Sequence, residues 1–252
     1  MRKIRIGKLG NWFYRVGIVA VFFLLVQVPP VAVVIANRDP TNQRLAISLA
    51  VVFVVMFLVI IAGARRVYRH YNQLPVAKGI NWRLVVGGYF TLIVGMMIFG
   101  WLNQWLFHQA GTANNEIIRQ LLNHNLIITV VFVISSFTLT PIAEELIFRG
   151  ILTNLFFNRT ALWSKMILSG LVFSAAHTST TIISFLLYCF MGMVLTYVYR
   201  QSGNLKNSIL VHGINNLVAM LMMVMSLAGS WLLQILQRCL LGCGSVLLAL
   251  NN

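Results

Sequence analysis

The chain alternates between long apolar runs and short polar stretches in which Lys and Arg gather. An apolar run of about 20 residues is long enough to cross a bilayer as a helix. Neither a soluble domain nor an internal repeat stands out. The pattern predicts an all-α fold, a polytopic membrane bundle of about eight transmembrane helices around a polar cavity. The expected segments, of which one is short or re-entrant, are 16–36, 45–64, 84–107, 126–140, 141–157, 162–177, 180–199, 206–225 and 231–248.

Prolines and polar residues mark the breaks in this pattern. Pro29 and Pro30 interrupt the first segment, and Pro141 suits the first turn of a new helix, where its missing N–H does no harm. Residues 110–124 form the only sizeable polar stretch, which we expect to be an interfacial helix.

Composition supports an integral membrane protein. Hydrophobic residues make up 59% of the chain and charged residues 9%, against about 25% charged in soluble domains. The net charge of +15 comes from basic residues at the ends of apolar runs. This distribution favours membrane lipid as a partner and excludes nucleic acid. The basic tail 1–8 predicts a cytoplasmic N-terminus, but strict alternation then puts the basic loop 158–165 outside.

Two of the four acidic residues in the chain, Glu144 and Glu145, are neighbours within an apolar region. A carboxylate there costs roughly 2.5–3.5 kcal/mol on insertion scales, so it marks a functional site by default. On a helix Glu145 and Arg149 share a face, whereas Glu144 is rotated by about 100°. The pattern therefore predicts a Glu145–Arg149 pair and a second carboxylate that faces something else. The alternative is a buried ion pair in which both glutamates share Arg149.

Other polar residues interrupt later segments. His177 ends one segment, and His212 and Asn216 share a face of another. Because the bilayer interior offers no water, we expect these side chains to meet Glu144 in one cavity. A carboxylate and histidines can activate water, and two histidines with a carboxylate also match a catalytic zinc site. The His-Glu-x-x-His helix of zincins is absent.

The ordered set Glu144-Glu145-x-x-x-Arg149, Phe173-x-x-x-His177 and His212-x-x-x-Asn216 resembles the CAAX protease and bacteriocin-processing family of intramembrane endopeptidases. The resemblance covers about 141–217. It implies a catalytic core at 126–228, preceded by membrane segments without a family signature at 1–125 and followed by an apolar segment at 229–252.

The resemblance also implies roles. Glu144 is the general base, assisted by His177, while His212 and Asn216 polarise the scissile carbonyl. Glu145, Arg149 and Phe173 orient the site. The cofactor stays open: zinc on Glu144, His177 and His212, or a metal-free glutamate mechanism. The implied location is a bacterial plasma membrane.

Three functions are compatible with these residues. The first is an intramembrane endopeptidase that acts on a peptide or protein substrate, in CAAX-type processing, bacteriocin maturation or self-immunity. The second is an immunity or binding protein that captures its partner without proteolysis. The third is a proton-coupled transporter that uses the buried Glu and His as a relay, although no repeated half supports it.

Overall fold

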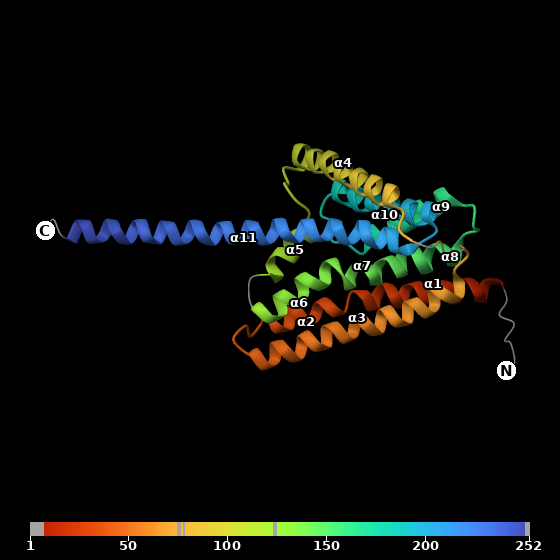
Figure 1. The fold of residues 1–252 in the computed structure, drawn as a ribbon, viewed down its shortest axis with the longest axis horizontal. Helices are drawn as coiled ribbons and strands as arrows, with labels where there is room; N and C mark the ends of the chain where they lie inside the picture. The colour runs from red at the N-terminus through yellow and green to blue at the C-terminus, as the bar shows by residue number, and fades with distance from the viewer. Residues whose placement is uncertain (1–7, 75–76, 78, 123–124, 250–252) are drawn as a thin grey trace. The chain divides into compact units, whose positions relative to one another are not determined.

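The computed structural model describes residues 8–74, 77, 79–122 and 125–249, with side chains from residue 11 to residue 229. All regular elements in these ranges are helices (Figure 1). They are α1 (Lys8–Val26), α2 (Pro29–Ala36), α3 (Gln43–Tyr71), α4 (Trp82–Phe107), α5 (Ala113–Leu121), α6 (Leu126–Phe137), α7 (Leu139–Glu144), the π-helix η1 (Glu145–Leu152), α8 (Thr153–Phe156), α9 (Leu162–Ala175), α10 (Ile182–Ser202) and α11 (Leu205–Ala249).

The helices confirm the expected polytopic helical fold but not the count of eight. In the described residues five helices are long and apolar enough to cross a membrane, and the number rises to six if the bent pair formed by 126–137 and 139–156 counts as one span. Pro29 and Pro30 divide the first span into α1 and α2, as their position in the sequence predicts. The expected segments 206–225 and 231–248 form one helix, α11, because no proline or loop interrupts them.

Short polar side chains set where the helices begin. Asn42, Asn81 and Asn125 each accept a hydrogen bond from the first turn of α3, α4 and α6. Thr181 and Ser184 form a capping box that starts α10. The expected interfacial helix is α5, which begins at the cap Thr112 and has no buried residue.

The bend in segment 126–156 accounts for the position of the basic loop 158–165 that follows it. The sequence divided this segment into two spans, whereas the structure joins them into one path with a bend of 42°. The Gln73 side chain, just after α3, donates to the carbonyls of Asn154 (2.8 Å) and Phe157 (3.2 Å). The loop after α8 therefore lies at the same end as the basic end of α3, and the charge conflict disappears. Arg2, Lys3 and Arg5 of the tail lie outside the described residues.

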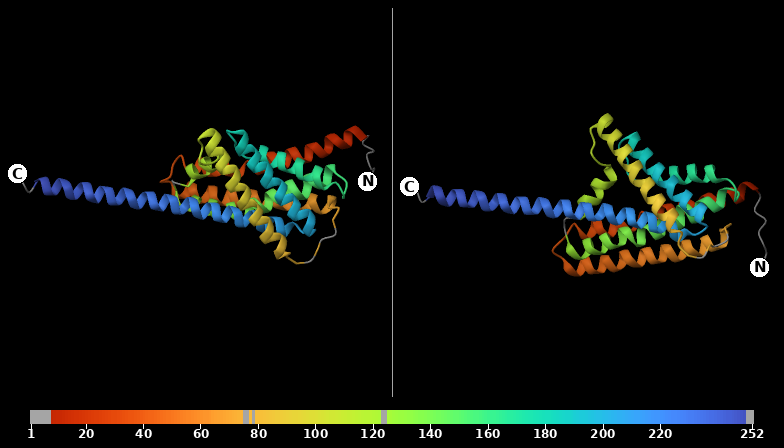
Figure 2. Two further views of the ribbon diagram at one scale, coloured as in Figure 1. Left: turned by 90° about the horizontal axis from the view of Figure 1, so that it is seen from above. Right: turned by 45° about the horizontal axis from the view of Figure 1, so that its top comes forward.

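The chain divides into two units, Met1–Asn216 and Leu217–Asn252, with the boundary inside α11. In the first unit α4 lies beside α10, and α10 packs closely on α9 (Figures 1 and 2). Two glycines permit this second contact, since a Cβ on Gly192 would lie 2.7 Å from the Cα of Gly170. All predicted site residues belong to the first unit. The three-part domain division stays a prediction.

Candidate active site

The two glutamates lie where the bent segment changes its helical form. Pro141 lacks the N–H that would bond the carbonyl of Phe137, and the path breaks at Thr138 between α6 and α7. From Glu145 to Leu152 the backbone is a π-helix, in which every residue is buried. The helix expected over 141–157 is therefore present as α7, η1 and α8, but its middle part is a π-helix instead of an α-helix. Short π segments often occur at functional sites.

Side chains stabilise the return from the π-helix to α8. The Thr153 hydroxyl donates to the carbonyl of Arg149, and the Asn154 amide donates to the carbonyl of Gly150, both at 2.6 Å. Both side chains are buried, so each bond satisfies polar atoms that water cannot reach. These bonds hold the wider turn in place beneath the glutamates.

Glu145 is a buried carboxylate with two basic partners. Its Oε1 lies 3.0 Å from Arg149 Nη1 and 3.0 Å from His212 Nδ1, and the Glu145 and Arg149 side chains are both 0% exposed. The structure thus contains the Glu145–Arg149 pair that the spacing predicted. It adds His212, which the sequence did not connect to Glu145. Since an ionised carboxylate only accepts, the Nδ1 of His212 must carry the hydrogen of this bond.

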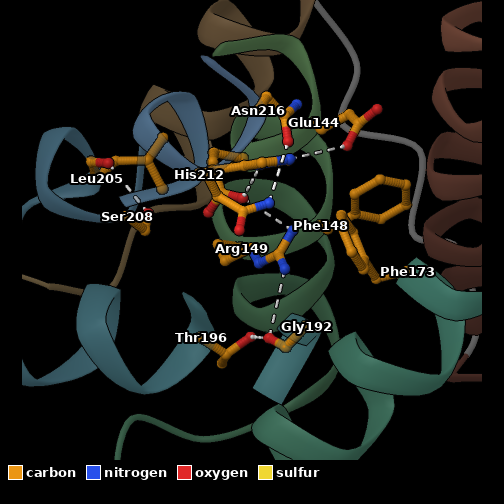
Figure 3. A network of polar contacts seen from close by, with 12 residues as sticks. Glu144, Phe148, Arg149, Phe173, Gly192, Thr196, Leu205, Ser208, His212 and Asn216 are labelled. Atoms are coloured by element: carbon orange, nitrogen blue, oxygen red, sulfur yellow. Dashed lines mark hydrogen bonds and ion pairs between the residues drawn. The ribbon is translucent and has the colours of Figure 1, made fainter. Parts of the chain in front are cut away.

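Arg149 is fixed on its other sides by α9 and α10. Its Nη2 donates to the carbonyl of Gly192 at 3.4 Å, and its guanidinium lies 4.4 Å from the ring centroid of Phe173 (Figure 3). The Phe173 ring also meets the His212 ring edge to face at 5.6 Å. Phe173 therefore packs against both partners of Glu145, which agrees with an orienting position.

Glu144 faces the opposite edge of the same imidazole. Its Oε2 lies 3.8 Å from His212 Nε2, which is too long for a hydrogen bond, and this oxygen has no hydrogen-bond partner among the described residues. The Glu144 side chain is 14% exposed, against 0% for Glu145. Oε2 of Glu145 also has no hydrogen-bond partner among the described residues. The two carboxylates therefore differ in exposure, and only the Glu144 side chain is partly accessible to another group.

His177 lies at the end of α9 in an aromatic setting. Its Nδ1 is 2.8 Å from the carbonyl of Phe173, and its ring stacks on Tyr188 with centroids 4.5 Å apart. The Tyr188 hydroxyl shares a hydrogen bond of 2.8 Å with Thr112, the cap of α5. These contacts fix the imidazole plane and connect it to α5. Tyr188 and Thr112 were not singled out from the sequence, where only a polar tip in an apolar segment marks Tyr188.

Asn216 joins α11 to the bent segment. Its side-chain nitrogen donates to the carbonyl of Ser136 at 2.9 Å, and its oxygen lies 3.5 Å from the amide nitrogen of Asn215. One hydrogen of the Asn216 amide is therefore bonded to a backbone carbonyl, and the second hydrogen can donate to another group. Ser136 gave no signal in the sequence, because the acceptor is its main-chain carbonyl.

Close packing brings His212 to the glutamates. A Cβ on the next residue, Gly213, would lie 2.9 Å from the carbonyl oxygen of Phe137. This is the carbonyl that Pro141 leaves without its helical donor. The bend in the segment and the missing side chain of Gly213 together allow α11 to approach at the level of the site.

The described residues do not form a preformed metal site. No three of their His, Cys, Asp and Glu side chains are grouped as a metal ion requires. His212 presents Nδ1 to Glu145 and only Nε2 toward Glu144. A trio of Glu144, His177 and His212 does not fit an ion as it stands, so we derive no step through a metal, and zinc stays a prediction.

Comparison with known proteins identifies this part of the chain. Residues 126–218 match the family model described as type II CAAX prenyl endopeptidase Rce1-like. The chain carries an Rce1-like region. This region contains both glutamates, both histidines and Asn216, and the match confirms the resemblance to the CAAX protease and bacteriocin-processing family. These findings support a similarity to CAAX-protease-like membrane peptidases over this region.

Curated relatives extend the likeness beyond the Rce1-like region. The chain is 28% identical to "UPF0177 protein YbdI" of Lactococcus lactis, over 69% of this chain and 91% of the relative. It is 22% identical to "Putative membrane peptidase YdiL" of Bacillus subtilis, over 74% of this chain and 77% of the relative. "UPF0177 protein YaiF" of Lactococcus lactis is 26% identical, over 77% and 89%. No solved structure matches the chain.

Proposed function

We propose that this protein is an intramembrane endopeptidase that hydrolyses a peptide bond with a water molecule activated by Glu144. The observation that carries the proposal is the position of His212 between the two glutamates, with Nδ1 3.0 Å from Glu145 and Nε2 3.8 Å from Glu144. Glu145 orients the imidazole and stabilises its positive charge. Glu144 keeps an available oxygen beside the Nε2 edge.

The reaction follows from these two groups. Glu144 takes a proton from water as the oxygen of that water attacks the carbonyl carbon of the peptide. Protonated His212 donates its Nε2–H to the oxyanion that forms on the carbonyl oxygen. Glu144 then gives its proton to the leaving amine, and the carbon–nitrogen bond breaks. The distance of 3.8 Å between Glu144 Oε2 and His212 Nε2 suits these two roles, since the attacking oxygen and the oxyanion are bonded to the same carbon.

The remaining residues support these two groups. His177 assists proton transfer to and from Glu144, and Asn216 adds a second donor toward the oxyanion. Arg149 and Phe173 hold Glu145 and His212 in place, as their contacts of 3.0 Å and 5.6 Å suggest.

We infer that the substrate is a peptide or protein segment at the membrane, of the prenylated CAAX type or a bacteriocin peptide. The relatives come from bacteria, which favours a bacterial plasma membrane. Basic residues gather at the end of the first unit where α3 and α10 end, and this favours a cytoplasmic location for that end and for the N-terminus. A reporter fused to the N-terminus and read for sidedness tests the orientation.

The decisive experiment compares Glu144→Gln with Glu116→Gln. Glu116 is an exposed glutamate of α5 that receives a hydrogen bond only from Gln120 in the described residues, so it is a matched control. The purified full chain is incubated with membrane peptides, prenylated and unmodified, and new termini are identified by mass spectrometry. Loss of a general base predicts cleavage that is 10²–10⁴-fold slower in Glu144→Gln, with unchanged melting. The control cleaves like wild type.

Cleavage by Glu144→Gln at the wild-type rate would refute the proposed base. A Glu144→Gln protein that still protects cells from a bacteriocin would instead support a binding or immunity role without proteolysis. Proton-driven flux in proteoliposomes would support the transporter.

A further inference from the structure

A second polar cluster lies away from the glutamates, at the start of α9. Lys165 belongs to the first turns of this helix, and its side chain is 0% exposed. Its Nζ has no hydrogen-bond partner in the part of the chain that the structure describes. Buried lysines are ordinarily paired, because an isolated buried charge is costly. Here the ion pairs of the described residues involve only Glu144 and Glu145.

Two arginines add to the positive charge at Lys165. Arg200, at the end of α10, donates from Nη2 to the carbonyl of Arg159 at 2.6 Å. Its other terminal nitrogen, Nη1, is buried and without a hydrogen-bond partner among the described residues. The charge of Arg200 acts on Lys165, and that of Arg159 acts on Arg200. The Tyr199 ring, 6.0 Å from the Arg200 guanidinium, offsets part of this repulsion, and an anion would neutralise the rest.

The start of α9 contributes further donors. The N-cap residue is Ala161, no side chain caps the helix, and the Leu162 N–H donates to the Thr160 carbonyl at 2.9 Å, so the further donors are the N–H groups that follow Leu162. The first N–H groups of a helix lack partners within the helix, and the positive end of the helix dipole lies there. Helix starts therefore attract phosphate groups. In the first turns of α9, Lys165 adds a buried ammonium group that has no hydrogen-bond partner among the described residues.

We propose that Lys165, Arg200 and the start of α9 form a binding site for a phosphate group. A phosphate offers several acceptor oxygens and enough negative charge to neutralise cations that no carboxylate reaches. The site lies at the end of the first unit where α8 ends and the basic end of α3 is found. At the surface of a bilayer this chemistry is supplied by the headgroup of an anionic phospholipid. Free inorganic phosphate has the same acceptor oxygens and negative charge, and it is the second candidate ligand.

The test measures how lipids change the melting temperature of the full-length protein in nanodiscs. One arm uses phosphatidylcholine, one adds phosphatidylglycerol, and one adds inorganic phosphate to phosphatidylcholine discs. A ligand at about a hundred times its dissociation constant raises the melting temperature by about 5–10 °C for a chain of this size. The variants are Lys165→Met, Arg200→Gln and the control Arg83→Met. Arg83 is an exposed cation in the first turn of α4.

We expect phosphatidylglycerol to stabilise wild type and Arg83→Met equally and Lys165→Met hardly at all. Lys165→Met should also melt no lower than wild type in phosphatidylcholine, because the buried unpaired charge is gone. Arg200→Gln provides a second measurement if Lys165→Met does not fold. Stabilisation by inorganic phosphate alone supports the site and assigns it to soluble phosphate. Equal stabilisation of wild type, Lys165→Met and Arg200→Gln by phosphatidylglycerol overturns the proposal.

Discussion

Replacing Gly213 by Ala would test whether the close approach of α11 positions the active site. The added Cβ would lie 2.9 Å from the Phe137 carbonyl oxygen, which is backbone and cannot rotate away. Carbon–oxygen contacts of this kind are comfortable at about 3.3–3.6 Å. The two segments must therefore separate by about 0.4–0.7 Å. If His212 moves with its helix, its 3.0 Å bond to Glu145 lengthens beyond the hydrogen-bonding range.

The expected effect on catalysis follows from this displacement. Because a misplacement of about 1 Å can cost 10²-fold, about half an ångström predicts a loss of roughly 10-fold. The assay is cleavage of a substrate accepted by wild type, normalised to folded protein. Gly100→Ala in α4 is the control, since no described atom lies within 4 Å of a Cβ at that position. Ala favours a helix over Gly by about 1 kcal/mol, so the control should be active and at least as stable. The reasoning would be refuted if Gly213→Ala had wild-type activity and were stabilised as much as the control variant.

Three further predictions address the groups around His212 and His177. Glu145→Gln should destabilise the protein by about 3–5 kcal/mol in chemical denaturation, since it leaves Arg149 buried without its counter-charge; unchanged stability would contradict a buried ion pair. Tyr188→Phe should cost about 0.5–1.5 kcal/mol through the lost bond to Thr112, measured by thermal melting, and no loss would mean that this bond does not hold. A glutamate mechanism predicts full activity after chelator treatment, whereas a loss that zinc reverses would establish the metal mechanism.

Residue spacing predicted part of the site. Arg149 follows Glu145 by four positions, and this spacing correctly predicted their pairing. Glu144 was expected to face something other than Arg149, and its Oε2 lies 3.8 Å from His212 Nε2. The bond between His212 and Glu145 depends on how closely α11 approaches the bent segment, which no spacing in either segment specifies.

The count of about eight spans is not confirmed, for a different reason. Hydrophobicity records the length of an apolar run, but the break at Thr138 bends the segment without turning it back. Pro141 therefore indicated the start of a new span, and strict alternation placed the loop after it opposite the basic end of α3, although Gln73 contacts Asn154 of α8 and Phe157 just after it. The π-helix could not be predicted from the sequence either, because its hydrogen-bond register depends on side-chain contacts such as those of Thr153 and Asn154. Lys165 looked like an ordinary loop cation, since nothing in the sequence around it indicates full burial.

The π-helix makes the motif sensitive to deletion as well as to substitution. In a π-helix each hydrogen bond joins residues i and i+5, whereas in an α-helix it joins residues i and i+4. Each hydrogen-bonded loop of the π-helix therefore contains one residue more. Deleting one residue within 145–152 would let the segment relax into an α-helix, and because the wide turns take up one extra residue, the parts before and after the deletion would keep nearly the same orientation. A deletion between Glu145 and Arg149 would nevertheless bring these two residues from four to three positions apart and disturb their 3.0 Å ion pair. The number of residues between Glu145 and Arg149 is therefore a structural requirement in its own right.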